Sequence, residues 1–88
     1  METQLDTETA QNIQDRLARI EGQVRGISKM VDERRRCDQI VMQVLAARAA
    51  LEKVAAAVVA YSIDECLALP PDQAKKVISD SIGLLTQL

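Results

Sequence analysis

The sequence predicts an all-α protein with three helices, in a single domain that spans residues 1–88. Three observations predict this fold class. Glycine occurs three times and proline only at Pro70 and Pro71, apolar residues recur with the period of a helix, and no segment alternates apolar with polar residues as a strand does. A chain of 88 residues buries little of its surface by itself. We therefore expect copies of the chain to associate.

The first helix is expected over residues 9–31, after a disordered segment at residues 1–8. Its apolar side chains follow one another at steps of four and three, which places them on one stripe. Arg16 and Arg19 lie on one flank of this stripe and Arg25 on the other, since successive residues turn by about 100°. The residues of the stripe are Ile13, Leu17, Ile20, Val24, Ile27 and Val31.

A second, long helix is expected over residues 33–67, because this stretch is rich in alanine and holds no glycine or proline. Asp32 suits its N-cap position, where a carboxylate accepts hydrogen bonds from the first turn. Pro70 and Pro71 end the segment, since proline has no N–H to donate. A third helix follows over residues 71–85. Its predicted buried face consists of Ala74, Val77, Ile78, Ile82 and Leu85.

The two cysteines lie on the same face of the second helix. Cys37 and Cys66 are 29 positions apart, which is eight turns plus about 20°. At a rise of 1.5 Å per residue they stand roughly 43 Å apart, so they cannot meet within one chain. They can meet only between two chains that lie antiparallel. For either cysteine alone, a role as a small buried apolar residue is the alternative.

The residues that lie opposite each other in an antiparallel pair of identical helices show whether this arrangement is plausible. The register that sets Cys37 opposite the partner's Cys66 places the two-fold axis between Leu51 and Glu52. It also sets apolar residues opposite one another, although a helix so rich in alanine tolerates neighbouring registers as well. The matched pairs include Ile40 with Ile63, Val44 with Val59 and Leu45 with Val58.

The surroundings of the two thiols differ. Cys37 follows three arginines at the start of its helix, where the cations and the positive end of the helix dipole favour the thiolate. Cys66 follows two acidic residues at the other end, where ionisation is disfavoured. We predict that Cys37 attacks an electrophilic sulfur first and that the partner's Cys66 resolves the product. Plain solubility is the alternative role of the arginines. The predicted thiol-tuning residues are Arg34, Arg35 and Arg36.

The net charge of −2 is distributed unevenly. Residues 1–15 hold four acids and no base, whereas residues 16–36 hold seven bases and three acids. Such a basic segment can bind the phosphates of DNA even though the whole chain is acidic. A solvated helix face is the alternative interpretation of the same charges.

Several functional classes are excluded by composition. Without histidine there is no Ser-His-Asp or Cys-His catalysis and no imidazole metal ligand. A thiol enzyme or a sulfur carrier would need an acid–base partner for its cysteine, and this chain has no histidine to act as one. We therefore expect that the protein is not an enzyme and holds no cofactor. Tyr61 is the single aromatic residue, which leaves no stacking platform for single-stranded nucleic acid. The N-terminus has no signal-peptide pattern and no stretch is long enough to span a membrane, so we expect a cytoplasmic protein with reduced cysteines.

Residues 16–27 read RLARIEGQVRGI, which resembles the RLxRIEGQVRGI signature of the CsoR/RcnR family of bacterial repressors. Cys37 and Cys66 match the cysteine spacing of that family, and the resemblance covers nearly the whole chain. It implies a three-helix protomer, an antiparallel four-helix-bundle dimer with cysteine sites between subunits, and a dimer of dimers. It also implies double-stranded operator DNA that is released when an effector occupies those sites. The DNA-contact residues implied by the family's basic surface are Arg16, Arg19 and Lys53, with Arg48 and Arg25.

Departures from the family pattern point to the effector. Copper-sensing members have a histidine where this chain has Ser62, and a Tyr and a Glu where it has Arg36 and Ile82. Nickel and cobalt sensing relies on histidines, and formaldehyde sensing on a proline where this chain has Glu2. Two cysteines without histidine resemble the persulfide-sensing CstR branch. The implied effector is persulfide or polysulfide, which links the subunits by a di-, tri- or tetrasulfide.

One alternative keeps the fold and the DNA role but changes the effector. In it, Cys37 and Cys66 of two subunits hold Cu(I) in linear coordination, because soft thiolate ligands suit that ion.

Overall fold

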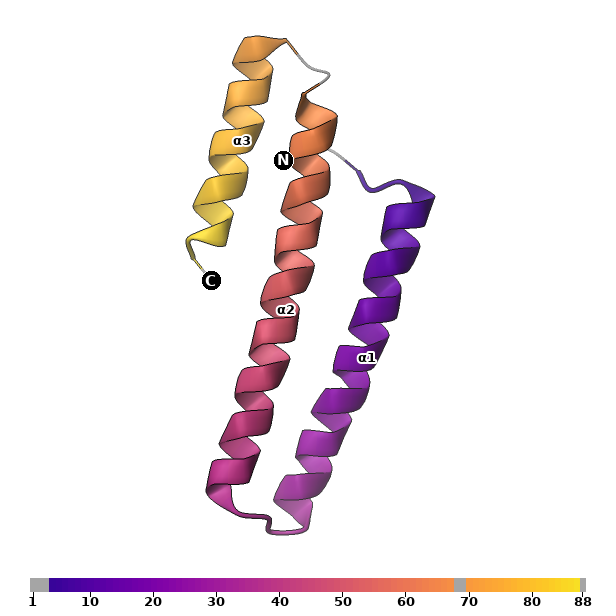
Figure 1. Cartoon of the computed structure of the whole chain (residues 1–88), viewed down its shortest axis with the longest axis vertical. Helices are drawn as coiled ribbons and strands as arrows, with labels where there is room; N and C mark the ends of the chain where they lie inside the picture. Colours follow the sequence, from indigo (N-terminus) through magenta and orange to yellow (C-terminus); the bar gives the residue numbers. More distant parts are fainter. Residues whose placement is uncertain (1–3, 68–69, 88) are drawn as a thin grey trace.

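The computed structural model describes residues 4–67 and 70–87, with Cys66 described by its backbone alone. Helix α1 spans Thr7–Asp32, α2 spans Cys37–Cys66 and α3 spans Pro71–Leu85. The central helix α2 packs antiparallel to α1 on one side and to α3 on the other (Figure 1), and α1 and α3 do not contact each other in the described part of the chain. The described residues contain no strand, so the predicted all-α fold class is confirmed.

The three helices form a layer one helix thick. The molecule measures 55 × 26 × 13 Å, and the shortest dimension is close to the diameter of a single helix. Only four of the described apolar residues are buried, namely Ile13, Ile20, Ala47 and Val59. Eleven large apolar side chains are exposed. A single protomer therefore has almost no interior of its own.

Helix α1 begins earlier than the sequence indicated. Asp6 is its N-cap, and the backbone N–H of Thr9 donates to the Asp6 carboxylate at 2.7 Å. Hydrogen bonds from the side chain and backbone of Thr9 hold the pKa of Asp6 below its ordinary value of 3.8. The expected disorder over residues 1–8 is therefore wrong for residues 7 and 8, which are helical. Residues 1–3 lie outside the described residues.

The turn between α1 and α2 also differs from the prediction. Asp32 is the last residue of α1 and does not cap α2, which begins four residues later than expected, at Cys37. The N–H of Arg34 bonds to the carbonyl of Val31, and the N–H of Arg35 to that of Met30. This is the Schellman arrangement that closes a helix, with Arg34 in the left-handed conformation at φ 57°. Glycine usually occupies that position, so the sequence carried no signal for the turn.

The predicted apolar stripe of α1 is divided in two. Ile13 and Ile20, seven residues apart, are buried against α2. Leu17, Val24 and Val31 repeat at the same interval but are 41%, 51% and 55% exposed. Leu17 follows Ile13 by four residues and Val24 follows Ile20 by four, so each lies about 40° around the helix from its buried counterpart. Half of the stripe therefore has no partner within the protomer.

Helix α3 lies at the predicted residues but is turned slightly from its predicted orientation. Ser81 is fully buried and its hydroxyl donates to the carbonyl of Val77 at 2.8 Å. Ile82, which was expected in the buried face, is 53% exposed. On α2, Ser62 is buried and donates in the same way to Val58 at 3.0 Å. The small side chain of Ser81 lets α3 approach α2 closely.

Membrane insertion finds no support in these helices. Over the described residues, none of them combines the length and the apolar character that crossing a bilayer requires.

Removal of the α1 cap is expected to destabilise the protein. Asp6→Ala should lower the melting temperature by a few degrees, because it leaves a helix N–H without its acceptor. The lowered pKa of Asp6 means that the stabilisation is present above pH 3.8 and is lost as the pH falls through the folded-state pKa. Asp6→Asn should retain a cap without this pH dependence. Equal melting temperatures for wild type and Asp6→Ala at pH 7 would contradict the assignment.

Substitution of Arg34, the residue in the left-handed conformation, by glycine should stabilise the protein. Arg34→Gly removes the side chain that disfavours a positive φ and should raise the free energy of unfolding by about 1 kcal/mol. Arg35→Gly, beside it, is the control and should not stabilise. Urea denaturation at one protein concentration measures both. Destabilisation by Arg34→Gly would show that the Schellman turn is not the solution conformation.

Candidate functional site

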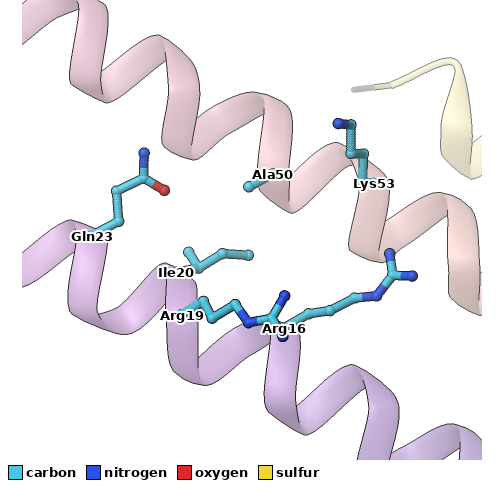
Figure 2. Close-up of a pocket in the computed structure, with 6 residues that line it drawn as sticks. All are labelled: Arg16, Arg19, Ile20, Gln23, Ala50 and Lys53. Carbon is cyan, nitrogen blue, oxygen red and sulfur yellow. The ribbon is translucent and has the colours of Figure 1, made fainter.

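A cationic hollow lies between α1 and α2, with a volume of about 260 Å³. Figure 2 shows Arg16 and Arg19 projecting from α1 and Lys53 from α2, around the apolar side chains of Ile20 and Ala50. Gln23 completes the lining, which contains no acidic residue. Three cations therefore surround one concave surface and can bind an anion such as a phosphate group.

The helical period explains how these side chains converge. Arg16, Arg19 and Gln23 follow one another by three and four residues, so they share a flank of α1, as the sequence predicts. The Nε of Arg16 donates to Asn12, one turn earlier, at 3.0 Å. This bond orients the guanidinium while its remaining N–H groups stay available as donors. Arg16, Arg19 and Lys53 are all exposed to solvent.

The structure does not place the other two predicted DNA-contact residues in the hollow. Arg25 is exposed on the opposite flank of α1, where its guanidinium lies near Gly22. Arg48 lies about 140° around α2 from Lys53, and its Nε is 3.2 Å from the Glu52 carboxylate. The five predicted residues therefore do not form one surface.

The opposite side of the same layer is apolar. On α1, Arg16 follows the buried Ile13 by three residues and Leu17 follows it by four, so the two side chains point to opposite sides of the contact with α2. On α2, Ala50 and Leu51 are divided in the same way about the buried Ala47. Ala50 lines the hollow. The side that faces away from the hollow is therefore apolar, and its exposed residues include Leu17, Val24, Val31, Val44 and Leu51.

Cys37 belongs to this apolar side. It precedes Val44 by seven residues, which leaves it within about 20° of that side chain. Cys37 is exposed and is the first residue of α2, as expected for a thiol at the positive end of a helix dipole. The side chain of Cys66 lies outside the described residues, but its backbone ends α2. The continuous helix between them confirms that the two residues cannot meet within one chain.

The arginines before Cys37 are partly occupied by neighbours on α2. Arg36 forms an ion pair with Asp38 at 2.9 Å, with both side chains largely exposed. Arg35 donates to Gln39 at 3.4 Å. Asp38, the residue after the cysteine, is a functional neighbour that the sequence-based prediction missed, although its position beside Cys37 indicates a charge that offsets Arg36. The tuning of Cys37 by the three arginines stays a prediction.

The described residues contain no group of three or more histidine, cysteine, aspartate or glutamate side chains that could hold a metal ion. Ser62, which stands where copper sensors have histidine, is 3% exposed, and its hydroxyl donates to the carbonyl of Val58. A single protomer offers no preformed metal site in this part of the chain.

Tyr61 joins the start of α1 to the end of α2. Burial raises the pKa of its hydroxyl above the ordinary value of 10, and the carboxylates of Asp6 and Glu65 raise it further. The backbone N–H of Asp6 also interacts with this hydroxyl. The contact between Tyr61 and Asp6 could not be predicted from the sequence, because no local pattern marks a contact between residues 55 positions apart.

A model of one protein family, described as the metal-sensitive transcriptional repressor family, matches residues 9–87. The chain belongs to this family. The match covers all three helices and the hollow, so it confirms the resemblance that the signature in α1 indicated. Family members are transcriptional repressors and not enzymes.

Two relatives of this repressor-family chain are copper sensors. The chain is 45% identical to the copper-sensing transcriptional repressor CsoR of Bacillus subtilis (strain 168), over 64% of its own length and 55% of that protein. It is 36% identical to the copper-sensing transcriptional repressor RicR of Mycobacterium tuberculosis (strain ATCC 25618 / H37Rv), over 69% of its length and 64% of that protein. The matches thus span less than two thirds of each relative.

A solved structure resembles the whole repressor-family fold. The nickel-responsive transcriptional regulator InrS matches with a TM-score of 0.81 and 29% sequence identity, over 97% of this chain and 98% of that one. The likeness confirms the three-helix protomer. It leaves the persulfide-sensing branch, suggested by the two cysteines without histidine, as a prediction.

Proposed function

We propose that this chain is a cytoplasmic, DNA-binding transcriptional repressor that senses persulfide or polysulfide through an inter-subunit pair of cysteines. The supporting observation is the division of one helical layer into a cationic side and an apolar side that carries Cys37. Helix α2 contributes Lys53 to the first side and the cysteine to the second. A chemical change at the thiol can therefore reach the DNA contact through a single helix.

The cationic side supplies the contact with operator DNA. Arg16, Arg19 and Lys53 present positive charge around one hollow, and guanidinium and ammonium groups bind backbone phosphates. Neither helix of the hollow is part of a visible helix-turn-helix, so we attribute sequence preference largely to the shape of the DNA. We assign Arg48 and Arg25 no part in this contact, because both point away from the hollow.

The apolar side supplies the dimer. Its exposed side chains on α1 and α2 need a partner that matches them, and a second antiparallel copy buries them as a four-helix bundle. Cys37 of each protomer then approaches the partner's Cys66. Two such dimers are proposed to form the homotetramer.

The thiol chemistry proceeds by exchange. The Cys37 thiolate attacks the outer sulfur of an organic persulfide, R–S–SH, which forms Cys37–S–SH and releases the thiolate RS⁻. The thiolate of the partner's Cys66 then attacks the Sγ of Cys37 and expels the outer sulfur as HS⁻, which leaves a disulfide between the two Sγ atoms. If both cysteines are first persulfidated, the same exchange leaves a trisulfide and HS⁻. The persulfide is the oxidant in each case.

Coupling to DNA follows from the continuity of α2. A covalent link at its ends moves α2 relative to α1, and α2 carries Lys53 while α1 carries Arg16 and Arg19. The hollow then loses its shape, and the spacing between the two hollows of a dimer changes. Either change weakens a contact that depends on several phosphates at fixed separations.

A second candidate effector is Cu(I). It is favoured by the copper-sensing relatives CsoR and RicR and by the affinity of thiolates for this soft ion. In this case Cys37 and the partner's Cys66 would act as two linear ligands. Ser62 would contribute nothing, since its hydroxyl is buried and hydrogen-bonded within α2.

Loss of a cation from the hollow should weaken DNA binding and reduce its dependence on salt. Arg19→Ala and Lys53→Ala should each lower the slope of log affinity against log salt by about 0.9. Gel retardation of the promoter beside the chain's own gene, at several salt concentrations, measures this slope. Lys29→Ala, an exposed cation on the other flank of α1, is the matched control. Equal slopes for all four proteins would exclude the hollow as the DNA contact.

Persulfide should link two subunits covalently only when both cysteines are present. Intact-mass spectrometry of the wild type after persulfide treatment should show a dimer that survives unfolding and is cleaved by a thiol reductant. Cys37→Ser and Cys66→Ser should each show only the mass of a single chain under the same conditions, because neither can form the covalent link. The linked wild type should no longer retard the promoter fragment. Tight Cu(I) binding that releases DNA, with persulfide inert, would replace the proposed effector by copper.

A further inference from the structure

An ion pair lies in the middle of the apolar side of α2. The Nε of Arg48 is 3.2 Å from the Glu52 carboxylate, one helical turn away. The two side chains are 64% and 45% exposed, among exposed apolar neighbours that include Val44 and Leu51. Helix position places Arg48 within about 20° of the line that joins Cys37 to Cys66. These charges therefore occupy the surface on which a second copy would pack.

Burial of an ion pair against apolar side chains can be unfavourable, because desolvation can outweigh the attraction of the two charges. Additional partners of opposite charge can offset this cost. Within a dimer the second copy brings its own Arg48 and Glu52. Whether those groups arrive within reach depends on the register of the two α2 helices.

The register that unites the cysteines also unites the ion pairs. With the two-fold axis between Leu51 and Glu52, the partner's Glu52 lies level with Leu51. Arg48 is then three residues, or about 4.5 Å along the axis, from the partner's Glu52, and four residues, or about 6 Å, from its own. The order of charges along the seam is arginine, glutamate, glutamate, arginine. Each guanidinium can therefore bridge both carboxylates.

We infer that Arg48 and Glu52 are specificity-determining residues that select the antiparallel register in which a second copy of this chain brings its Cys66 to Cys37. This inference rests on the proposed dimer. It gives Arg48 a role between subunits in place of the DNA contact that the sequence suggested. The pair acts as buried polar residues do in coiled coils, where they favour one alignment over others of equal apolar content.

Competing alignments lack this arrangement. In a parallel dimer Arg48 faces the partner's Arg48 and Glu52 faces the partner's Glu52, so like charges meet. The antiparallel register can also shift by one heptad in either direction. The first shift places the partner's Arg48 ten residues from the level of Glu52. The second shift, in the opposite direction, places it four residues from that level. The first shift moves the two ion pairs apart along the seam, and the second moves the carboxylates apart and brings the arginines together. The alanine-rich remainder of α2 discriminates weakly among such registers.

A charge-reversal experiment tests the inference. Arg48→Glu and Glu52→Arg are purified separately, mixed, and examined by native mass spectrometry, which resolves the two chains by mass. Each homodimer would gather four like charges at the two-fold axis, so its dissociation constant should rise at least about tenfold. In the mixed dimer the charges alternate along the seam, so each charge lies next to an opposite charge of the partner chain. It should exceed each homodimer by about tenfold or more, instead of the statistical ratio of about two.

Lys76→Glu and Asp80→Lys provide the matched control, since they lie at the same spacing on the exposed surface of α3. Their mixture should give the statistical ratio. A statistical ratio for the Arg48 and Glu52 variants, with the wild type dimeric and bound to promoter DNA, would overturn this inference alone. A wild type that stays monomeric would instead overturn the proposed dimer, and with it the proposed function.

A second variant covers the case in which the reversed chains fail to fold alone. Arg48→Gln with Glu52→Gln keeps the size of both side chains and removes the charges. Its dimers should lose alignment, so that persulfide links Cys37 to Cys37 and Cys66 to Cys66 as well as Cys37 to Cys66. Peptide mapping of the linked dimer distinguishes these products. Links between Cys37 and Cys66 alone, as in the wild type, would count against the inference.

Discussion

The structure depends on the fact that α2 has more apolar surface than its two neighbours can cover. Its side chains are apolar around most of the helix, whereas α1 and α3 contact it only along two opposite strips. The layer is therefore one helix thick, and large residues such as Val41 and Leu45 remain about half exposed. Burial of this surface in a second copy is the main source of stability open to the chain. In the proposed dimer, folding and association are therefore coupled.

Most of the fold could be predicted from local patterns. The period of the apolar residues in α1, the alanines of α2 and the two prolines before α3 were sufficient to locate three helices. Two details were missed because they depend on contacts that no local pattern records. The turn before Cys37 is closed by Arg34 in a conformation that usually signals glycine, and the buried face of α3 centres on Ser81 because a small side chain fits closely against α2.

The candidate site was predictable in part. Helical geometry alone placed Arg16 and Arg19 on one flank and set Cys37 at the start of a helix. The family resemblance added Lys53, and the structure shows that it lines the same hollow. The family resemblance also suggested Arg48, but this side chain points away from the hollow. The resemblance implied a basic surface for the helix as a whole and did not distinguish one side of the helix from the other. The contact of Tyr61 with Asp6 was not predicted, because the two residues are distant in sequence.

The separation of the cationic and apolar sides has a consequence for how such repressors diversify. Cys37, the proposed sensor thiol, lies on the apolar side of this layer of helices, and Arg16, Arg19 and Lys53, the proposed DNA contacts, lie on the other side. Substitutions near the proposed sensor thiol on the apolar side can therefore accumulate without altering the proposed DNA contact on the cationic side. One scaffold can thus serve relatives named for copper and for nickel, and also this chain, which contains no histidine.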